Sequence, residues 1–198
     1  ARGEGVDLSS MEGWDIVVSE DALPGEAYAA EEFQSLFAEA SGIRLPIVKT
    51  TDRADRHVFI GPSEAMTISA AGFDVAEFGS EDLRIVVQGN NIAIAGGRPR
   101  GTLYGVYTFL ENYVGVRFLT QNHTHVPKIA SSHVVGPVDY FYHPPLTLRS
   151  TDYVNISGGP PFGVRLRNNT HAGGSKLGGK TTLRITGHMF AGQIPSAK

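Results

Sequence analysis

The segment from Gly96 to Leu119 restricts the possible folds more than any other part of the sequence. It opens with the glycine turn Gly96-Gly97-Arg98-Pro99-Arg100-Gly101 and closes with an apolar run, Val116 to Leu119. Between them apolar residues recur at the spacing of one buried helix face, namely Leu103, Val106, Tyr107, Leu110 and Val114. Gly115 follows, and glycine readily adopts the left-handed conformation that ends many helices. The segment therefore predicts a strand end, a turn, a helix over about residues 100–114 and a further strand.

The preceding residues show the same alternation of short strands and helices. Strands are predicted at residues 14–18, 45–49, 57–60, 83–87 and 92–95. A helix is predicted between Pro24 and Gly42, with Ala30, Phe33, Phe37 and Ala40 on its buried face, and a shorter one at residues 63–70. Gln88-Gly89-Asn90-Asn91 is typical of a hairpin turn, since glycine and asparagine tolerate positive φ. Residues 1–145 are therefore expected to form an α+β fold, an α/β sandwich with helices packed on a mixed β-sheet.

The character of the chain changes near residue 150. Residues 1–150 carry 11 basic and 19 acidic groups, whereas residues 151–198 carry six basic groups and one acid, Asp152. A strand is predicted at Val134 to Val138, and His143-Pro144-Pro145 is typical of a linker, because proline restricts the backbone. From Gly158 onward the sequence is rich in glycine and shows little periodicity. We therefore expect two regions, 1–145 and 146–198, the second poorly ordered, packed on the first or completed by another chain.

Composition excludes several function classes. Cysteine is absent, which rules out disulfides, thiolate metal sites and cysteine nucleophiles. No apolar run approaches the roughly 20 residues of a membrane helix, and Ala1 to Gly5 contain no apolar signal core. The basic C-terminal part lacks the interleaved aromatics of a nucleic-acid site. We expect no membrane or nucleic-acid partner and no cofactor.

Gly174-Ser175-Lys176-Leu177-Gly178-Gly179-Lys180-Thr181 matches the phosphate-loop pattern G-x-x-x-x-G-K-[ST]. That site needs a hydrophobic strand before the loop and a helix after it. Residues 167–172 make a poor buried strand, and residues 182–187 make a poor helix, being β-branched and interrupted by glycine. A chance match in a glycine-rich loop is favoured over an ATP-binding site.

The turn at Gly96 to Gly101 offers a second candidate site. It is not a dinucleotide fingerprint, since its glycines do not follow G-x-G-x-x-G. A helix N-terminus attracts anions, and Arg98 and Arg100 would strengthen that attraction. An anion or sugar-acid contact at Arg98 and Arg100 is one hypothesis, and a purely structural turn is the other, favoured one.

The remaining polar motifs are weaker. His123 and His125 lack a nearby third ligand, so a surface position is favoured over a metal site. His171 and His188 could meet only through the fold. Glycosylation sequons occur at Asn122, Asn155 and Asn168 and matter only in a glycosylating compartment. No G-x-S-x-G turn marks a nucleophilic serine.

The segment Gly96 to Leu119 resembles one in the N-terminal domains of large bacterial glycoside hydrolases. These are relatives of α-glucuronidases and of the non-catalytic domain that precedes the barrel in β-hexosaminidase-type enzymes. Three shorter pieces carry the same resemblance: Ala29-Ala30-Glu31-Glu32-Phe33, Ser41-Gly42-Ile43-Arg44-Leu45-Pro46-Ile47 and His57-Val58-Phe59-Ile60-Gly61. Together they cover about residues 12–150, and they are more specific for the fold than for a substrate.

The resemblance implies that residues 146–198 begin a (β/α)8 barrel, which is incomplete at Lys198. Leu146 to Arg149 would start it, and Arg149, Asn168 and His188 would be candidate substrate contacts near its sugar site. Glycoside hydrolysis uses two carboxylates, and Asp152 is the only acid after residue 151. No catalytic residue is therefore assigned, and these 198 residues alone are expected to be inactive.

The predicted function is that of a non-catalytic accessory domain. Its parent enzyme would hydrolyse glycosidic bonds, with uronic-acid or amino-sugar glycans as the implied substrates and the periplasm or the exterior of a bacterium as the implied location. The expected partners are a carbohydrate and the rest of the catalytic barrel or another chain. The alternative is a stand-alone carbohydrate- or protein-binding module. Trp14, the only tryptophan, opens a predicted strand, so a core position is favoured over a sugar-binding surface.

Overall fold

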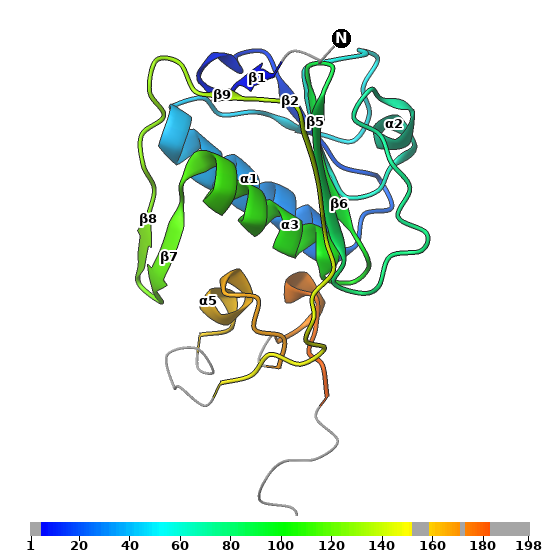
Figure 1. Ribbon diagram of the computed structural model, residues 1–198, viewed down its shortest axis with the longest axis vertical. Coiled ribbons are helices and arrows are strands. Elements are labelled where there is room, and N and C mark those ends of the chain that lie inside the picture. The colour runs from blue at the N-terminus through cyan, green and yellow to red at the C-terminus, as the bar shows by residue number, and fades with distance from the viewer. Residues whose placement is uncertain (1–4, 152–158, 171–172, 183–198) are drawn as a thin grey trace, which may run out of the picture.

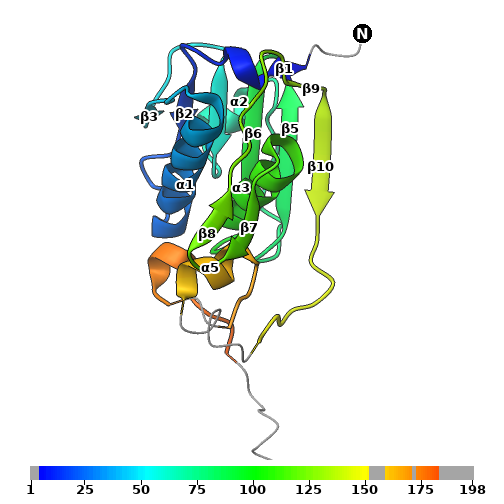
Figure 2. The same ribbon diagram turned by 90° about the vertical axis from the view of Figure 1, so that its left-hand side faces the viewer.

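The computed structural model describes residues 5–151, 159–170 and 173–182, and its centre is a six-stranded mixed sheet. The sheet has the strand order β10-β5-β6-β4-β2-β3 (Figures 1 and 2). Its strands are β2 (Asp15–Val17), β3 (Ile47–Val48), β4 (His57–Ile60), β5 (Leu83–Gln88), β6 (Asn91–Gly96) and β10 (Val138–Tyr142). Strands β3, β2, β4 and β6 pair in parallel, and β5 and β10 add antiparallel pairs.

Helices cover both faces of this sheet. Helices α1 (Pro24–Ser41) and α3 (Gly101–Phe109) lie side by side on one face, and the short α2 (Glu64–Ile68) lies on the other (Figure 1). A π-helical turn, η2 (Leu110–Val114), extends α3. The predicted helices and the α+β sandwich class are confirmed. We call residues 5–142 the body of the molecule.

The burial of apolar side chains in the core accounts for the positions of these helices and strands. Along β6 successive side chains alternate between faces, so that Ile92 and Ile94 face α1 and α3 while Ala93 and Ala95 face α2. The predicted apolar faces of α1 and α3 are buried, and Trp14 is in the core as expected. Helix α1 starts at Pro24, and Gly42 and Gly115 end their helices in the left-handed conformation, with φ of 78° and 91°.

The turns also follow the sequence. Gly89 and Asn90 both take positive φ between β5 and β6, as a two-residue hairpin turn requires. A Cβ atom at Gly96, Gly97 or Gly101 would overlap the backbone oxygen of Asp82 or of Gly79. The glycines of the turn at residues 96–101 therefore allow α3 to start close against the loop that precedes β5.

Four short strands form two small additional sheets. One pairs β1 (Val6–Asp7) with β9 (Val134–Val135), and the other pairs β7 (Arg117–Thr120) with β8 (His123–His125). The 3-10 helix η1 (Leu8–Ser10) follows β1. The single strand predicted at Val134 to Val138 is wrong: β9 and β10 are separate and belong to different sheets. Pro137, which cannot donate to a ladder, stands between them.

The described residues after Pro145 lie against one end of the helical layer (Figure 1). We call the described residues among them, 146–151, 159–170 and 173–182, the docked segment. Helix α5 (Pro160–Arg165) and the 3-10 helix η3 (Ser175–Leu177) are its regular elements. These ranges contain no strand, so the barrel start and the boundary at residue 145 stay predictions. Of the three outcomes expected for this region, its described part shows packing on the body.

Candidate functional site

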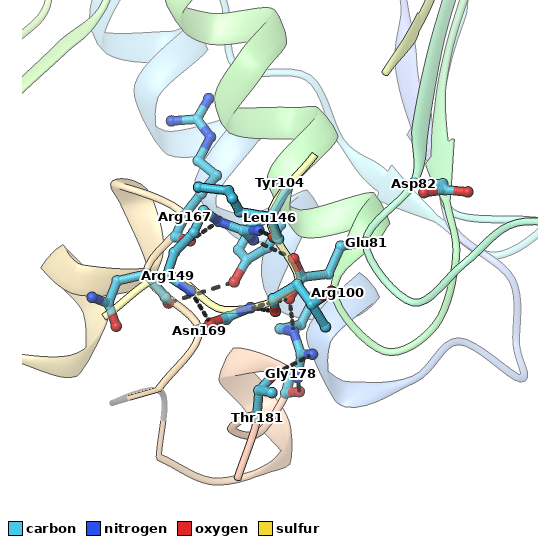
Figure 3. A network of polar contacts seen from close by, with 12 residues as sticks. Glu81, Asp82, Arg100, Tyr104, Leu146, Arg149, Arg167, Asn169, Gly178 and Thr181 are labelled. Carbon is cyan, nitrogen blue, oxygen red and sulfur yellow. Dashed lines mark hydrogen bonds and ion pairs between the residues drawn. The ribbon is translucent and has the colours of Figure 1, made fainter. Parts of the chain in front are cut away.

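A buried carboxylate, Glu81, lies where the docked segment meets the body (Figure 3). Its side chain is 6% exposed. Oε1 accepts hydrogen bonds from Arg100 Nε at 2.7 Å and from Asn169 Nδ2 at 2.8 Å, and Oε2 pairs with Arg149 Nη2. Since Arg100 comes from the body and Arg149 and Asn169 from the docked segment, one carboxylate joins the two regions. We call Glu81, Arg100, Arg149 and Asn169 the Glu81 cluster.

The backbone of the docked segment is held by the same groups. Asn169 Oδ1 accepts from the Arg149 backbone N–H at 2.9 Å, and Asn169 Nδ2 donates to the Thr147 carbonyl at 2.9 Å. Arg149 Nε donates to the Arg167 carbonyl at 2.8 Å. These bonds link residues 147–149 to residues 167–169, so the cluster also fixes the shape of the docked segment.

Two further carboxylates of the body bind arginines of the docked segment. Glu32 on α1 accepts from Arg165 Nε and Nη2 at 2.9 and 3.0 Å, a bidentate pair. Glu111 pairs with Arg167 at 2.6 Å. The docked segment is therefore attached mainly by charge-assisted hydrogen bonds, which are stronger than neutral ones.

Burial and hydrogen bonding act in opposite directions on the pKa of Glu81. Burial by itself would raise the pKa of Glu81, but hydrogen bonds from Arg149, Asn169 and Arg100 outweigh it, so that this pKa is lowered. Burial raises the pKa of Tyr104, next to the cluster, to about 12. At neutral pH Glu81 is therefore ionised and Tyr104 carries its proton.

The glycine-rich segment that matches a phosphate loop contacts the guanidinium of Arg100. Arg100 Nη1 donates to the Gly178 carbonyl at 3.1 Å, and Nη2 donates to Thr181 Oγ1 at 3.0 Å (Figure 3). Gly178 takes φ of 80°, and a Cβ atom there would overlap the Arg100 side chain. The segment presents acceptors to a guanidinium, whereas a phosphate loop presents N–H donors to an anion. This geometry agrees with the interpretation as a chance match.

Both arginines of the predicted anion site are paired with carboxylates of the chain itself. Arg98 makes a bidentate pair with Glu26 at 2.9 and 3.1 Å, and Glu26 also accepts from the Leu23 backbone N–H at the start of α1. Arg100 pairs with Glu81. An external anion at Arg98 or Arg100 stays a prediction, and it would compete with these internal pairs.

The structure places two of the three predicted substrate contacts near each other. Arg149 belongs to the Glu81 cluster, and the backbone oxygen of Asn168 accepts from the Tyr104 hydroxyl at 3.5 Å. His188 lies outside the described residues. Sequence reasoning missed Glu81 and Asn169, which no motif marks. The charge contrast between residues 1–150 and 151–198 is the one signal that points to them.

The other candidates do not form a site. His123 and His125 are both exposed on β8, as favoured from the sequence. Within residues 5–151, 159–170 and 173–182, no three histidine or acidic side chains gather as metal ligands would. The helices in these ranges include none with the length and hydrophobicity to cross a membrane.

Comparison with known families identifies the body. The model of "Glycosyl hydrolase family 20, domain 2" matches residues 3–129, more than half of the chain. The chain belongs to this family. The match includes β2 through β8 with helices α1 and α3, the part for which the sequence predicted a glycoside hydrolase accessory domain, and it confirms that prediction.

Solved structures share the domain 2 fold at low sequence identity. The GH20 β-N-acetylhexosaminidase of Streptomyces coelicolor A3(2) has a TM-score of 0.53 and 13% identity over 85% of this chain. A mutant Streptomyces plicatus β-hexosaminidase bound to its product GlcNAc has 0.53 and 15%, also over 85%. A GH115 4-O-methyl-α-glucuronidase with specificity for decorated arabinogalactans has 0.51 and 14% over 80%.

These alignments cover only part of each known enzyme. The chain spans 32%, 31% and 24% of the three structures, respectively. No curated protein matches it. The likeness therefore shows the fold of domain 2, and it leaves the activity of a whole protein to be proposed.

Proposed function

We propose that this chain carries the accessory domain of a glycoside hydrolase together with the first part of its catalytic barrel. The parent enzyme cleaves glycosidic bonds of glycans that contain amino sugars or uronic acids. The names of the similar structures support this substrate range, since they include β-hexosaminidases and an α-glucuronidase. In this proposal the body binds the barrel and holds it in position.

The observation that carries this proposal is the Glu81 cluster. Glu81 of the body pairs with Arg149 and accepts a hydrogen bond from Asn169 at 2.8 Å, and these two bonds join the body to the docked segment across a buried contact. A stand-alone binding module, the alternative function, has no need for such a joint at the end of its fold. An accessory domain that must hold a catalytic domain in place does need one.

We infer that the chemistry of glycoside hydrolysis takes place outside this chain. It requires two positioned carboxylates, and the body carboxylates Glu32, Glu81 and Glu111 are already paired with arginines of the docked segment. Hydrogen bonds from Arg149, Asn169 and Arg100 lower the pKa of Glu81 despite its burial, which makes it a poor general acid. We therefore assign them to docking.

The test compares the 198-residue chain with a longer protein translated from the same reading frame. Both are assayed with nitrophenyl glycosides of N-acetylglucosamine and of glucuronic acid. We expect no turnover by the short chain and turnover of one substrate by the longer one. Turnover by the short chain would contradict its assignment as non-catalytic, and a longer protein inactive on both glycosides would contradict the assignment of the parent.

A matched pair of variants tests the docking role in the longer protein. Glu81→Gln removes the buried charge at the joint, whereas Asp139→Asn removes the exposed partner of Arg84 on the body. We expect Glu81→Gln to lower the melting temperature of the catalytic part, with Asp139→Asn close to the unmodified protein. Equal melting temperatures for the two variants would argue for a binding module without a docking role.

A further inference from the structure

Strand β10 forms one edge of the six-stranded sheet, and its outer side is unpaired (Figure 2). Within the described residues β10 pairs with β5 alone, on its inner side, and that pairing runs without a shift from Val138 to Tyr142. An unpaired edge presents a row of backbone N–H and C=O groups to any further strand. The edge of β10 is therefore a candidate docking surface for an extended segment.

The opposite edge of the sheet is protected against such pairing, whereas β10 is not. Natural edges are protected by very short strands, lysines, prolines or bulges. Strand β3, at the opposite edge, has only two residues, but β10 has five and contains neither lysine nor proline. Its one charge, Asp139, is neutralised by a bidentate pair with Arg84 of β5, with both bonds at 2.8 Å. The whole length of β10 is therefore open to a partner.

The side chains of β10 present aromatic rings on both faces of the sheet. Phe141 is 52% exposed and rests edge-on against Phe78, with ring centroids 5.3 Å apart, on the face that carries α2. Tyr142 is 41% exposed and shares the other face with Val138 and Tyr140, because side chains alternate along a strand. A partner strand would bury part of both rings.

The order of residues in β10 suits a second copy of the same strand, in an antiparallel pair centred on Tyr140. Val138 then lies opposite Tyr142 of the second copy. Asp139 lies opposite Phe141 of the second copy, away from the other carboxylate. Aromatic residues opposite β-branched residues are favourable cross-strand pairs, and like charges opposite each other are unfavourable. This register provides the first kind of pair twice and avoids the second.

The two neighbouring symmetric registers are less favourable. Centring on Asp139 would place two carboxylates directly opposite each other. Centring on Phe141 would place Pro144 opposite Val138, and proline cannot donate to a ladder. The sequence of β10 therefore favours the register centred on Tyr140.

A hollow of about 300 Å³ lies beside Val138 and provides room for a side chain of the second copy. Its lining includes Tyr113 of η2 and His133. Tyr113 and Val138 both pack against the core on the face that carries α1 and α3, which is also the face of Tyr142. Because Tyr142 of the second copy lies opposite Val138, its ring reaches this hollow. The two-fold symmetry repeats the contact at the other end, as a self-complementary interface requires.

We propose that β10 is a docking surface for a second copy of this chain, with antiparallel pairing centred on Tyr140 that joins the two sheets edge to edge. A five-residue strand pair is smaller than a standard interface of about 800 Å² per partner, so the dimer is weak, with a dissociation constant of about 0.1 mM. The proposal goes beyond the function proposed above and does not depend on it, because the body alone supplies the surface.

The first test measures the association of the 198-residue chain by sedimentation equilibrium between about 0.01 and about 1 mM. We expect a reversible monomer–dimer equilibrium. Phe141→Lys adds to β10 the charge that protects natural edges and should weaken association at least tenfold. Ile68→Lys is the matched control, since Ile68 is an 80% exposed apolar residue on α2, and it should associate as the unmodified chain does. A monomeric chain at about 1 mM, or equal weakening by both substitutions, would overturn the proposal.

The second test determines the register with single cysteine variants, because the chain contains no cysteine of its own. Tyr140→Cys places two thiols opposite each other, where Cα atoms about 4.5–5.5 Å apart allow a disulfide. Val138→Cys places its two thiols four residues apart along the strands, about 14 Å, which is too far. We expect oxidised dimers of Tyr140→Cys, and of Val138→Cys only when it is mixed with Tyr142→Cys.

Two results of the second test would contradict the proposed pairing. One is the absence of disulfide-linked dimers both in Tyr140→Cys and in the mixture of Val138→Cys with Tyr142→Cys, at concentrations where the unmodified chain dimerises. The other is equal cross-linking of Val138→Cys alone and of Tyr140→Cys. Since the two experiments use different positions of β10, a folding defect in one variant leaves the other measurements decisive.

Discussion

The body and the docked segment are held by different forces. The body buries an almost continuous set of apolar side chains between its sheet and α1 and α3, among them Phe33, Phe37 and Phe109. The docked segment adds only Phe162, Val164 and Leu177 to that core, and its main attachments are ion pairs to carboxylates of the body. The sources of stability therefore change between the body and the docked segment.

This difference has a physical consequence. Apolar burial contributes about 25 cal/mol per Å² whatever the pH and changes little with salt, whereas ion pairs depend on both. The body should therefore respond mainly to changes in packing, and the docked segment mainly to changes in charge. The predictions below test that separation.

The largest effect is expected from Phe33→Ala in α1. Phe33 is fully buried and stacks on Phe37 with ring centroids 5.5 Å apart. Loss of a core phenylalanine costs about 3–5 kcal/mol, because a cavity adds to the lost transfer energy. Chemical denaturation followed by far-ultraviolet circular dichroism should show this loss in the unfolding of the whole chain. Release of the docked segment alone, with the body as stable as before, would contradict the separation of forces.

The next largest effect is expected from Glu81→Gln. It leaves Arg100 and Arg149 with a neutral partner in a buried contact, at a cost of about 2–3 kcal/mol. The cost should fall on docking, so amide exchange of residues 159–170 should accelerate while that of β4 and β6 keeps its protection. Asp139→Asn, at an exposed pair, is the control and should change neither. Faster exchange in β4 and β6 would show that the cluster stabilises the body instead.

The sequence predicts the body well because the body is held by short-range patterns. The helix faces of α1 and α3, the Gly89-Asn90 hairpin and the strand His57–Ile60 each depend on residues that are neighbours in the chain. The wrong prediction at Val134 to Val138 also comes from a local pattern. An apolar run predicts a strand, but it does not show that the run is divided at Pro137 between two sheets.

The site was harder to predict because its residues are far apart in the chain. Glu81 and Arg149 are separated by 68 positions, and Arg100 and Thr181 by 81. No local spacing connects such residues, and each alone resembles an ordinary surface charge. The phosphate-loop match shows the reverse case, a local pattern whose surroundings give it another role. The opposite net charges of the two regions, which mark a change near residue 150, are the one sequence signal from which their contact could have been inferred.

Lowering the pH should release the docked segment from the body. The pKa of Glu81 is lowered in the folded protein, so its contribution is complete above the unfolded value of about 4.3 and is lost as the pH falls through the folded value. Around the folded pKa the loss is smaller than in Glu81→Gln, because there only part of the Glu81 population is protonated. Tyrosine fluorescence and amide exchange should report release below about pH 4.

Glu81→Gln provides the control for this titration, since it has no carboxyl at the joint to protonate. In that variant the acid-dependent change in docking should shrink. An identical pH profile for the variant and the unmodified chain would exclude Glu81 as the group responsible.

The smallest effect is expected from Lys176→Ala at the rim of the docked segment. Lys176 pairs with Glu31 at 3.3 Å and lies 4.7 Å from the centre of the Tyr28 ring, but both charged side chains are more than half exposed. Exposed ion pairs and cation–π contacts each contribute less than about 1 kcal/mol and are weakened by salt. Docking in about 0.05 M salt should therefore weaken slightly, and the difference from the unmodified chain should vanish in about 0.5 M salt. Lys180→Ala, an exposed lysine of the same glycine-rich segment, should match the unmodified chain at both concentrations. A loss that persists in high salt would mean that Lys176 acts through packing of its aliphatic stem on Tyr28, and the rim would then belong with the body in the comparison of forces.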